Sequence, residues 1–149
     1  MTYEKLIALM QTQKNKLTDL LDTLKSMQKA IIEQEYQDFN RTIELHQRIL
    51  SDIRNIEKDR TKLIISIIGN QSYSKEKLPQ MIFNALKVKD NNLKKKYLDL
   101  RDEITNLIKE VTRINFQNMY LIDNSRKLIK DLVVTIYGSA NQKILDKKV

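Results

Sequence analysis

Apolar residues recur along the chain at alternating spacings of three and four, the pattern of amphipathic helices. The first stripe of apolar positions spans residues 3–31 and is interrupted once, by Gln13. It predicts a helix over about residues 2–33. Three flanking apolar residues widen the stripe, as expected for a helix that packs on two neighbours. The stripe is Tyr3, Leu6, Met10, Leu17, Leu20, Leu24, Met27 and Ile31, widened by Ile7, Leu21 and Ile32.

A second stripe predicts a helix over about residues 36–68, and Gly69 directly follows it. Its frame does not continue the first, because five residues separate Ile31 from Tyr36. We therefore expect a turn near residues 33–35, although no Gly or Pro marks it. The alternative is a kink in one continuous helix of roughly 66 residues, about 100 Å long, which would need a partner along its whole length. The second stripe is Tyr36, Phe39, Ile43, His46, Leu50, Ile53, Ile56, Leu63 and Ile67.

The third stripe is the longest and predicts a helix over about residues 90–137, which Gly138 would end. Before it we expect a polar loop at about 69–78 and a short helix at about 79–87, begun by Pro79. After it, a flexible tail would cover 138–149. The third stripe is Leu93, Tyr97, Leu100, Ile104, Leu107, Val111, Ile114, Asn118, Leu121, Ser125, Leu128 and Leu132.

These elements predict one all-α domain over residues 1–149, an elongated antiparallel bundle of three long helices with a short extra helix before the third. The third helix would pass the first turn near residue 122 and overhang it by about fifteen residues, at 1.5 Å per residue. An overhang in water should be polar, yet this stretch is apolar on more than one face. Either a partner covers it, or the helix bends back and the face is ordinary core. Its apolar residues include Phe116, Met119, Tyr120, Val134 and Ile136.

Composition excludes several classes of function. The 149 residues include no Cys, one His and 2 Gly, which leaves no material for a typical zinc site or a Gly-rich phosphate loop. His46 lies on the second stripe without other candidate catalytic residues beside it. We interpret it as a structural residue of the apolar helix face whose hydrogen-bonding groups are satisfied. We therefore expect no catalytic residues, no metal and no cofactor, and no enzyme activity.

The formal net charge is +8, with 27 Lys and Arg against 19 Asp and Glu. Most of this charge is Lys spread over all segments, and Lys94, Lys95 and Lys96 form the one tight cluster. Frequent Ile, Lys and Asn are typical of an AT-rich genome, so we do not expect nucleic-acid binding. The N-terminus lacks the pattern of a signal peptide and no apolar stretch is long enough to span a bilayer. We expect a cytoplasmic protein without membrane insertion.

Two segments carry a resemblance to a known family. Residues 113–122 contain Asn115-x-x-Asn118-x-x-Leu121-Ile122, and residues 135–142 read Thr-Ile-Tyr-Gly-Ser-Ala-Asn-Gln. Both resemble the C-terminal half of the FlgN family of flagellar type III export chaperones. The order of long and short helices is similar too. The chain departs from the family pattern in its net charge of +8 and in Asn141, where the family tends to carry a second Gly.

The resemblance implies a chaperone that binds the terminal amphipathic segments of both hook–filament junction proteins and prevents their premature association. It also implies delivery to the cytoplasmic domain of the export gate through Tyr137, with the export ATPase complex as a further partner. The alternative is a structural helical homodimer or coiled-coil adaptor that pairs through its C-terminal helix. A homodimer of the cargo-free chaperone is a separate expectation. The expected cargo-binding residues are Asn115, Asn118, Leu121, Ile122, Ser125, Leu128, Ile129, Leu132, Val133 and Ile136.

Overall fold

The computed structural model describes residues 2–68, Met81 and residues 91–148, and these are helical apart from a turn at 33–35. The helices are α1 (Thr2–Ile32), α2 (Tyr36–Ile68) and α4 (Asn91–Lys148). The described part is therefore all-helical. The expected loop at 69–78 and the expected short helix at 79–87 lie outside the described residues, except that Met81 is helical.

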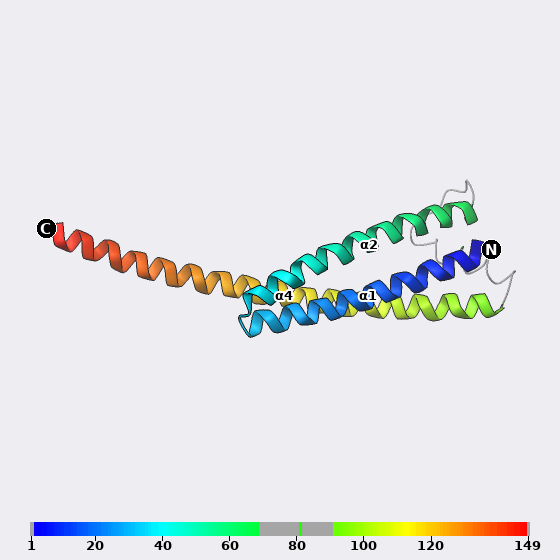
Figure 1. Cartoon of the computed structure of the whole chain (residues 1–149), viewed down its shortest axis with the longest axis horizontal. Coiled ribbons are helices and arrows are strands. Elements are labelled where there is room, and N and C mark those ends of the chain that lie inside the picture. The colour runs from blue at the N-terminus through cyan, green and yellow to red at the C-terminus, as the bar shows by residue number, and fades with distance from the viewer. Residues whose placement is uncertain (1, 69–80, 82–90, 149) are drawn as a thin grey trace.

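Helix α1 is the common partner of the other two helices and packs along both of them (Figure 1). Along the contact with α2, residue numbers increase on α1 while those of the bonded residues on α2 decrease. Gln13 hydrogen-bonds to Glu57, and Lys16, three residues later on α1, hydrogen-bonds to Asp52. Along the contact with α4, residue numbers increase together on both helices. Lys14 forms an ion pair with Glu103, and the Leu24 carbonyl, further along α1, accepts a hydrogen bond from Asn118. Helix α2 therefore runs back along α1, and α4 runs in the same direction as α1.

The core consists mainly of the stripe positions of α1 and α4, together with two residues of α2, and burial of their apolar side chains supplies the main stabilising free energy. Helix α1 contributes most of it and has apolar neighbours on two sides. Among the described side chains of α2, only Ile49 and Ile64 are fully buried apolar residues, and both lie beside the predicted second stripe. The residues of that stripe are half-buried, except for the exposed Tyr36. The buried cluster comprises Leu6, Met10, Leu17, Leu20, Leu24, Met27, Ile49, Ile64, Tyr97, Leu100, Ile104 and Ile114.

The turn between α1 and α2 has the hydrogen bonds of a Schellman motif. The Glu35 amide donates to the Ala30 carbonyl at 3.0 Å, and the Gln34 amide donates to the Ile31 carbonyl at 3.3 Å. Gln34 has a φ of 56°, in the left-handed region where Gly usually stands. A side chain there costs about 1 kcal/mol, which the capped carbonyls of α1 help to offset. The chain thus turns without the Gly that would have marked the turn in the sequence.

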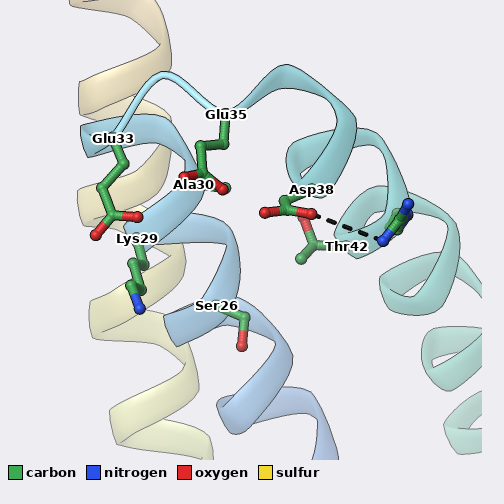
Figure 2. A pocket seen from close by; sticks show the side chains of 8 residues that line it. Ser26, Lys29, Ala30, Glu33, Glu35, Asp38 and Thr42 are labelled. Carbon is green, nitrogen blue, oxygen red and sulfur yellow. Dashed lines mark ion pairs between the residues drawn. The ribbon is translucent and has the colours of Figure 1, made fainter.

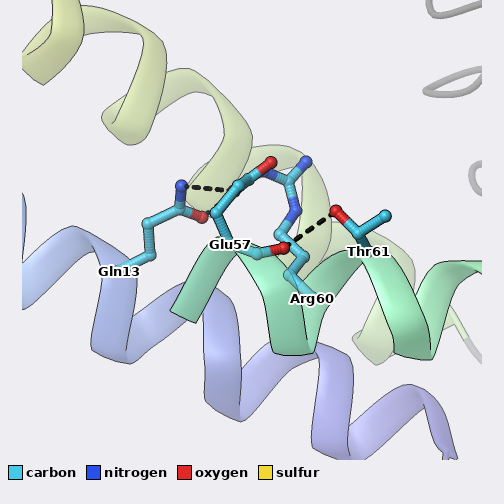
Figure 3. A network of polar contacts seen from close by, with 4 residues as sticks. All are labelled: Gln13, Glu57, Arg60 and Thr61. Atoms are coloured by element: carbon cyan, nitrogen blue, oxygen red, sulfur yellow. Dashed lines mark hydrogen bonds and ion pairs between the residues drawn. The ribbon is translucent and has the colours of Figure 1, made fainter. Parts of the chain in front are cut away.

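Gln13, the polar interruption in the first stripe, is buried in a polar layer between α1 and α2 (Figure 3). Its amide donates to Glu57 Oε2 at 3.2 Å, and its carbonyl oxygen accepts from Arg60 Nη1 at 3.4 Å. Arg60 Nη1 also donates to Glu57 Oε2 at 3.3 Å. The interruption is therefore a structural feature, because a satisfied buried polar group favours one register of two packed helices.

The expected end of the third helix at Tyr137 is wrong, whereas the expected flexibility of residues 138–149 stays a prediction. The backbone of α4 stays helical through Gly138 to Lys148. A glycine in a helix interior costs only about 1 kcal/mol relative to alanine. The following residues include no Pro and several good helix formers, among them Ala140, Gln142 and Leu145. Gly138 therefore weakens the helix locally without ending it.

Candidate partner-binding site

We define the apolar seam of α4 as the stripe of positions that faces α1, together with the positions that continue this stripe beyond the end of α1. Along residues 91–122, which we call the packed segment, α1 covers this seam. Residues 123–148, the free segment, extend past the α1–α2 turn (Figure 1). The free segment is about 40 Å long at 1.5 Å per residue. The seam is Tyr97, Leu100, Ile104, Leu107, Val111, Ile114, Asn118 and Leu121, followed by Ser125, Leu128, Leu132 and Ile136.

Asn118 is the last fully buried residue of the seam, with 1 % of its surface exposed. Its Nδ2 donates to the Leu24 carbonyl of α1 at 2.9 Å, and its Oδ1 is buried without a hydrogen-bond partner. One residue earlier, Gln117 accepts a hydrogen bond from Gln28 of α1 at 3.0 Å. These contacts fix the register of α4 against the end of α1. The side chain of Asn118 thus serves the contact with α1, and a direct contact with cargo would require α1 to move.

Beyond Ile122 the described apolar side chains of α4 are open to solvent. Leu128 is 63 % exposed and Leu132 is 55 % exposed, whereas Leu100 on the same seam is 6 % exposed. An isolated exposed leucine is common on protein surfaces, but a row of them at helical spacing is typical of a binding surface. The exposed row on the free segment comprises Leu128, Leu132, Val133 and Ile136, whereas Val134 is exposed on the opposite side of the helix.

The remaining expected cargo-binding residues fall into three groups. Leu121 and Ile122 are half-buried, at the point where α1 ends. Asn115 and Ser125 are exposed, and the Asn115 amide lies 4.0 Å from Met119 Sδ on its own helix. For Ile129, and for Tyr137 as the expected gate contact, the structure describes the helical backbone only, so both stay predictions.

Besides Val134, three exposed apolar residues near the end of the packed segment were not among the expected site residues: Phe116, Met119 and Tyr120. Phe116 and Tyr120 lie nearly opposite the seam, because each is two residues from Asn118 and a helix turns about 100° per residue. Together with Gln28, Gln117 and Leu121 they line a cleft of about 290 Å³ beside the end of α1. A helical wheel shows this second apolar face, but the sequence could not show that α1 leaves it uncovered.

Charges on the free segment are mixed and lie off the seam. Arg126, Lys127 and Lys130 are exposed together with Asp123 and Asp131. Within the packed segment, Arg113 donates to both carboxylate oxygens of Glu110, at 3.2 and 2.8 Å. The bond from Arg113 holds the pKa of the Glu110 carboxyl below its usual value. The arrangement presents an apolar row flanked by charges, which suits an amphipathic helix as partner.

A family model described as FlgN protein matches residues 1–145. The chain belongs to the FlgN family. FlgN proteins are flagellar export chaperones, which bind flagellar export substrates, and no enzymatic activity is known for the family. The match covers nearly the whole chain, so the family assignment extends beyond residues 113–142, where the resemblance was first visible. Searches for similar curated proteins and for similar solved structures gave no match.

A helix needs about 20 consecutive, predominantly apolar residues to cross a membrane. Within the described residues, no helix has a sufficiently long and apolar stretch. The exposed apolar row of this FlgN protein is flanked by charged residues such as Lys130 and Asp131.

Proposed function

We propose that this FlgN protein is a cytoplasmic chaperone that binds the terminal amphipathic segments of both hook–filament junction proteins. The cargo binds to the seam of the free segment. This binding prevents premature association of the junction proteins until the chaperone delivers them to the export gate. The observation that carries the proposal is the row of exposed apolar side chains on a helix that continues past its partner, with Leu128 63 % exposed.

The physical basis is the burial of two amphipathic helices against each other. A helix that lays its apolar face on another is read through anchors spaced at i, i+3 or i+4, and i+7. The free segment offers Ser125, Leu128 and Leu132 at this spacing, with Val133 and Ile136 beside them. Junction-protein termini that are ordered only on binding lose part of the gross interaction energy to that ordering. Affinity stays moderate as a result, which suits a chaperone that must release its cargo.

The test is calorimetric titration of the protein with a peptide of the C-terminal segment of a cognate junction protein. Replacing Leu128 and Leu132 together by Asp should abolish binding, because two charges would be buried in an apolar contact. Thermal unfolding followed by circular dichroism should stay unchanged, since both side chains are exposed. Leu45→Asp is the matched control, because Leu45 is an exposed leucine of α2 outside the free segment. Retained binding by the double variant would contradict the proposal.

Self-association through the same row is the competing use of this surface. A homodimer would bury the row of one copy against that of another, with no cargo required. Sedimentation velocity of the cargo-free protein measures its molar mass. A dimer at low micromolar concentration that persists when the junction-protein peptide is added would favour the structural adaptor over the chaperone.

Delivery to the gate is assigned to Tyr137, as the resemblance in residues 135–142 implies. Tyr137→Ala should leave the affinity for the cargo peptide within about twofold, since Tyr137 lies off the seam. The same change should abolish capture of the protein by the cytoplasmic domain of the export gate. A parallel capture with the export ATPase complex tests whether that contact uses the same residue. Unchanged capture by the gate domain would remove Tyr137 from the proposal.

A further inference from the structure

The turn between α1 and α2 points in the direction in which the free segment of α4 extends (Figure 1). Two large apolar side chains flank this turn and are largely exposed: Ile32, the last residue of α1, at 65 %, and Tyr36, the first residue of α2, at 70 %. Both positions lie at the end of the bundle, where the shared core stops. They contribute little to the core, so their apolar surface is available for contact with a partner.

The same turn is acidic. Residues 33–38 include Glu33, Glu35 and Asp38 and no basic residue. The three carboxylates line a pocket of about 410 Å³ at the turn (Figure 2). A hydrogen bond with Asp38, and the negative charges of Asp38 and Glu33, raise the pKa of the Glu35 carboxyl above its usual value. Two basic residues line the same pocket. Arg41 Nη1 lies 3.8 Å from Asp38 Oδ1, and Lys29 lies one helical turn before Glu33 on α1.

The seam of α4 passes this turn without a break. On one side of the turn it is covered by α1, which runs in the same direction as α4, and on the other side it is exposed. A helix laid on the exposed part, in line with α1, would continue an interface that the fold already contains. It would also meet the turn end-on, because Gln117 lies beside Gln28 and α1 ends four residues after Gln28.

We propose that the cargo helix docks parallel to α4 as a continuation of α1, with its N-terminus against the α1–α2 turn. The inference rests on the proposed function and adds the direction of the cargo and the point at which it stops. A helix N-terminus carries a partial positive charge and unpaired amide groups, which the carboxylates of the turn attract. The opposite direction would bring the partial negative charge of a C-terminus against three carboxylates. Ile32 and Tyr36 supply the apolar contact for the first turn of the docked helix.

The direction of the cargo can be measured with single spin labels, because the chain has no Cys of its own. One label is placed at the turn by Gln37→Cys and another on the free segment by Thr135→Cys, both at exposed positions. Thr135 lies about 20 Å along α4 beyond Leu121, at 1.5 Å per residue. The probe is a synthetic peptide of the C-terminal amphipathic segment of a junction protein, labelled at its N-terminus or at its C-terminus. Double electron–electron resonance gives the four distances.

We expect the N-terminal label of the bound peptide to be closer to residue 37 than to residue 135, and the C-terminal label to show the reverse order. A reversed order, or equal distances, would overturn the inference and leave the proposed function intact. Absence of binding in the calorimetric titration would overturn both. The two failures are therefore distinguishable in the same set of proteins.

Two pairs of variants test the contact at the turn. Ile32→Ala with Tyr36→Ala should weaken binding of the peptide about tenfold, whereas Leu45→Ala, an exposed leucine elsewhere on α2, should change it less than twofold. Glu33→Gln with Glu35→Gln should weaken binding about two- to fivefold, the range typical of a charge at a helix end. Glu44→Gln, an exposed carboxylate of α2, is its control. Wild-type affinity in both turn variants would overturn the role of the turn.

Discussion

The two parts of α4 carry the same apolar stripe but have opposite surroundings. In the packed segment α1 covers the stripe, and Leu100 is 6 % exposed. In the free segment the stripe continues with Leu128 and Leu132, but α1 has ended and these side chains face solvent. The same sequence pattern therefore stabilises the fold in one half of the helix and is available to a partner in the other. The position at which α1 ends separates the two roles.

The largest expected effect comes from matched truncations on the two sides of this boundary. Leu100→Ala should lower the free energy of unfolding by roughly 2–5 kcal/mol, because it leaves a cavity in the core. Leu128→Ala should change that free energy by no more than about 0.5 kcal/mol, since it removes an exposed side chain. Urea unfolding followed by circular dichroism measures both. Similar losses in the two variants would mean that the free segment is packed in solution.

Substitution of Asn118, the last fully buried residue of the seam, should change the free energy of unfolding by an amount that depends on the charge of the new side chain. Asn118→Asp should lower the free energy of unfolding by about 3 kcal/mol, since it leaves a carboxylate buried in place of an amide and removes the Asn118 donor to Leu24. Asn118→Leu should be neutral or stabilising, because it removes a buried Oδ1 that has no partner. Both values come from the same urea unfolding. A stabilising Asp variant would contradict the buried position.

A smaller effect is expected where α4 passes through Gly138. Gly138→Ala should stabilise the helix locally by about 1 kcal/mol, because alanine is the better helix former. The increase should appear as slower amide hydrogen exchange in the free segment. The urea midpoint of the bundle should not move, since the free segment lies outside the core. A shifted midpoint would show that both segments of α4 unfold as one unit.

The smallest effect concerns pH. Burial lowers the pKa of His46 on α2 from its ordinary value of 6.5. The folded protein therefore binds its proton less readily than the unfolded chain does. As pH falls from above 6.5 towards the lowered pKa, the unfolded chain takes up more protons and stability decreases. Below the lowered pKa this contribution is constant. The decrease should be smaller in His46→Gln, compared by urea unfolding at pH 7 and pH 5, and an equal decrease in both proteins would exclude His46.

Much of the architecture followed from periodicity. The stripes predicted α1 and α2 closely, because a spacing of three and four requires one helical face. The change of frame between Ile31 and Tyr36 predicted the turn at 33–35, although Gln34 occupies the left-handed position where Gly is usual. The end of α4 could not be predicted in the same way. Gly138 has the residue type of a helix end, but its cost is too small to stop a helix that good helix formers continue.

The candidate site was predictable only in part. The sequence identified Leu128 and Leu132 as apolar positions beyond the expected end of the first helix, and the structure leaves both exposed. It could not show that Asn118 is buried, because that depends on where the Leu24 carbonyl lies. Exposure of Phe116 and Tyr120 depends on which side of α4 is approached by α1, and no residue spacing encodes that side.

Residue spacing alone specifies long amphipathic helices in this chain and a third helix whose apolar stripe is longer than any partner helix. This pattern is local, because helical periodicity is a property of neighbouring residues. Which part of that stripe is covered depends on how the helices pack in three dimensions. That division depends on the register between α1 and α4, which Asn118 and Gln117 fix through contacts with Leu24 and Gln28. Such contacts join residues about ninety positions apart, and their distance in space appears only when the chain is folded.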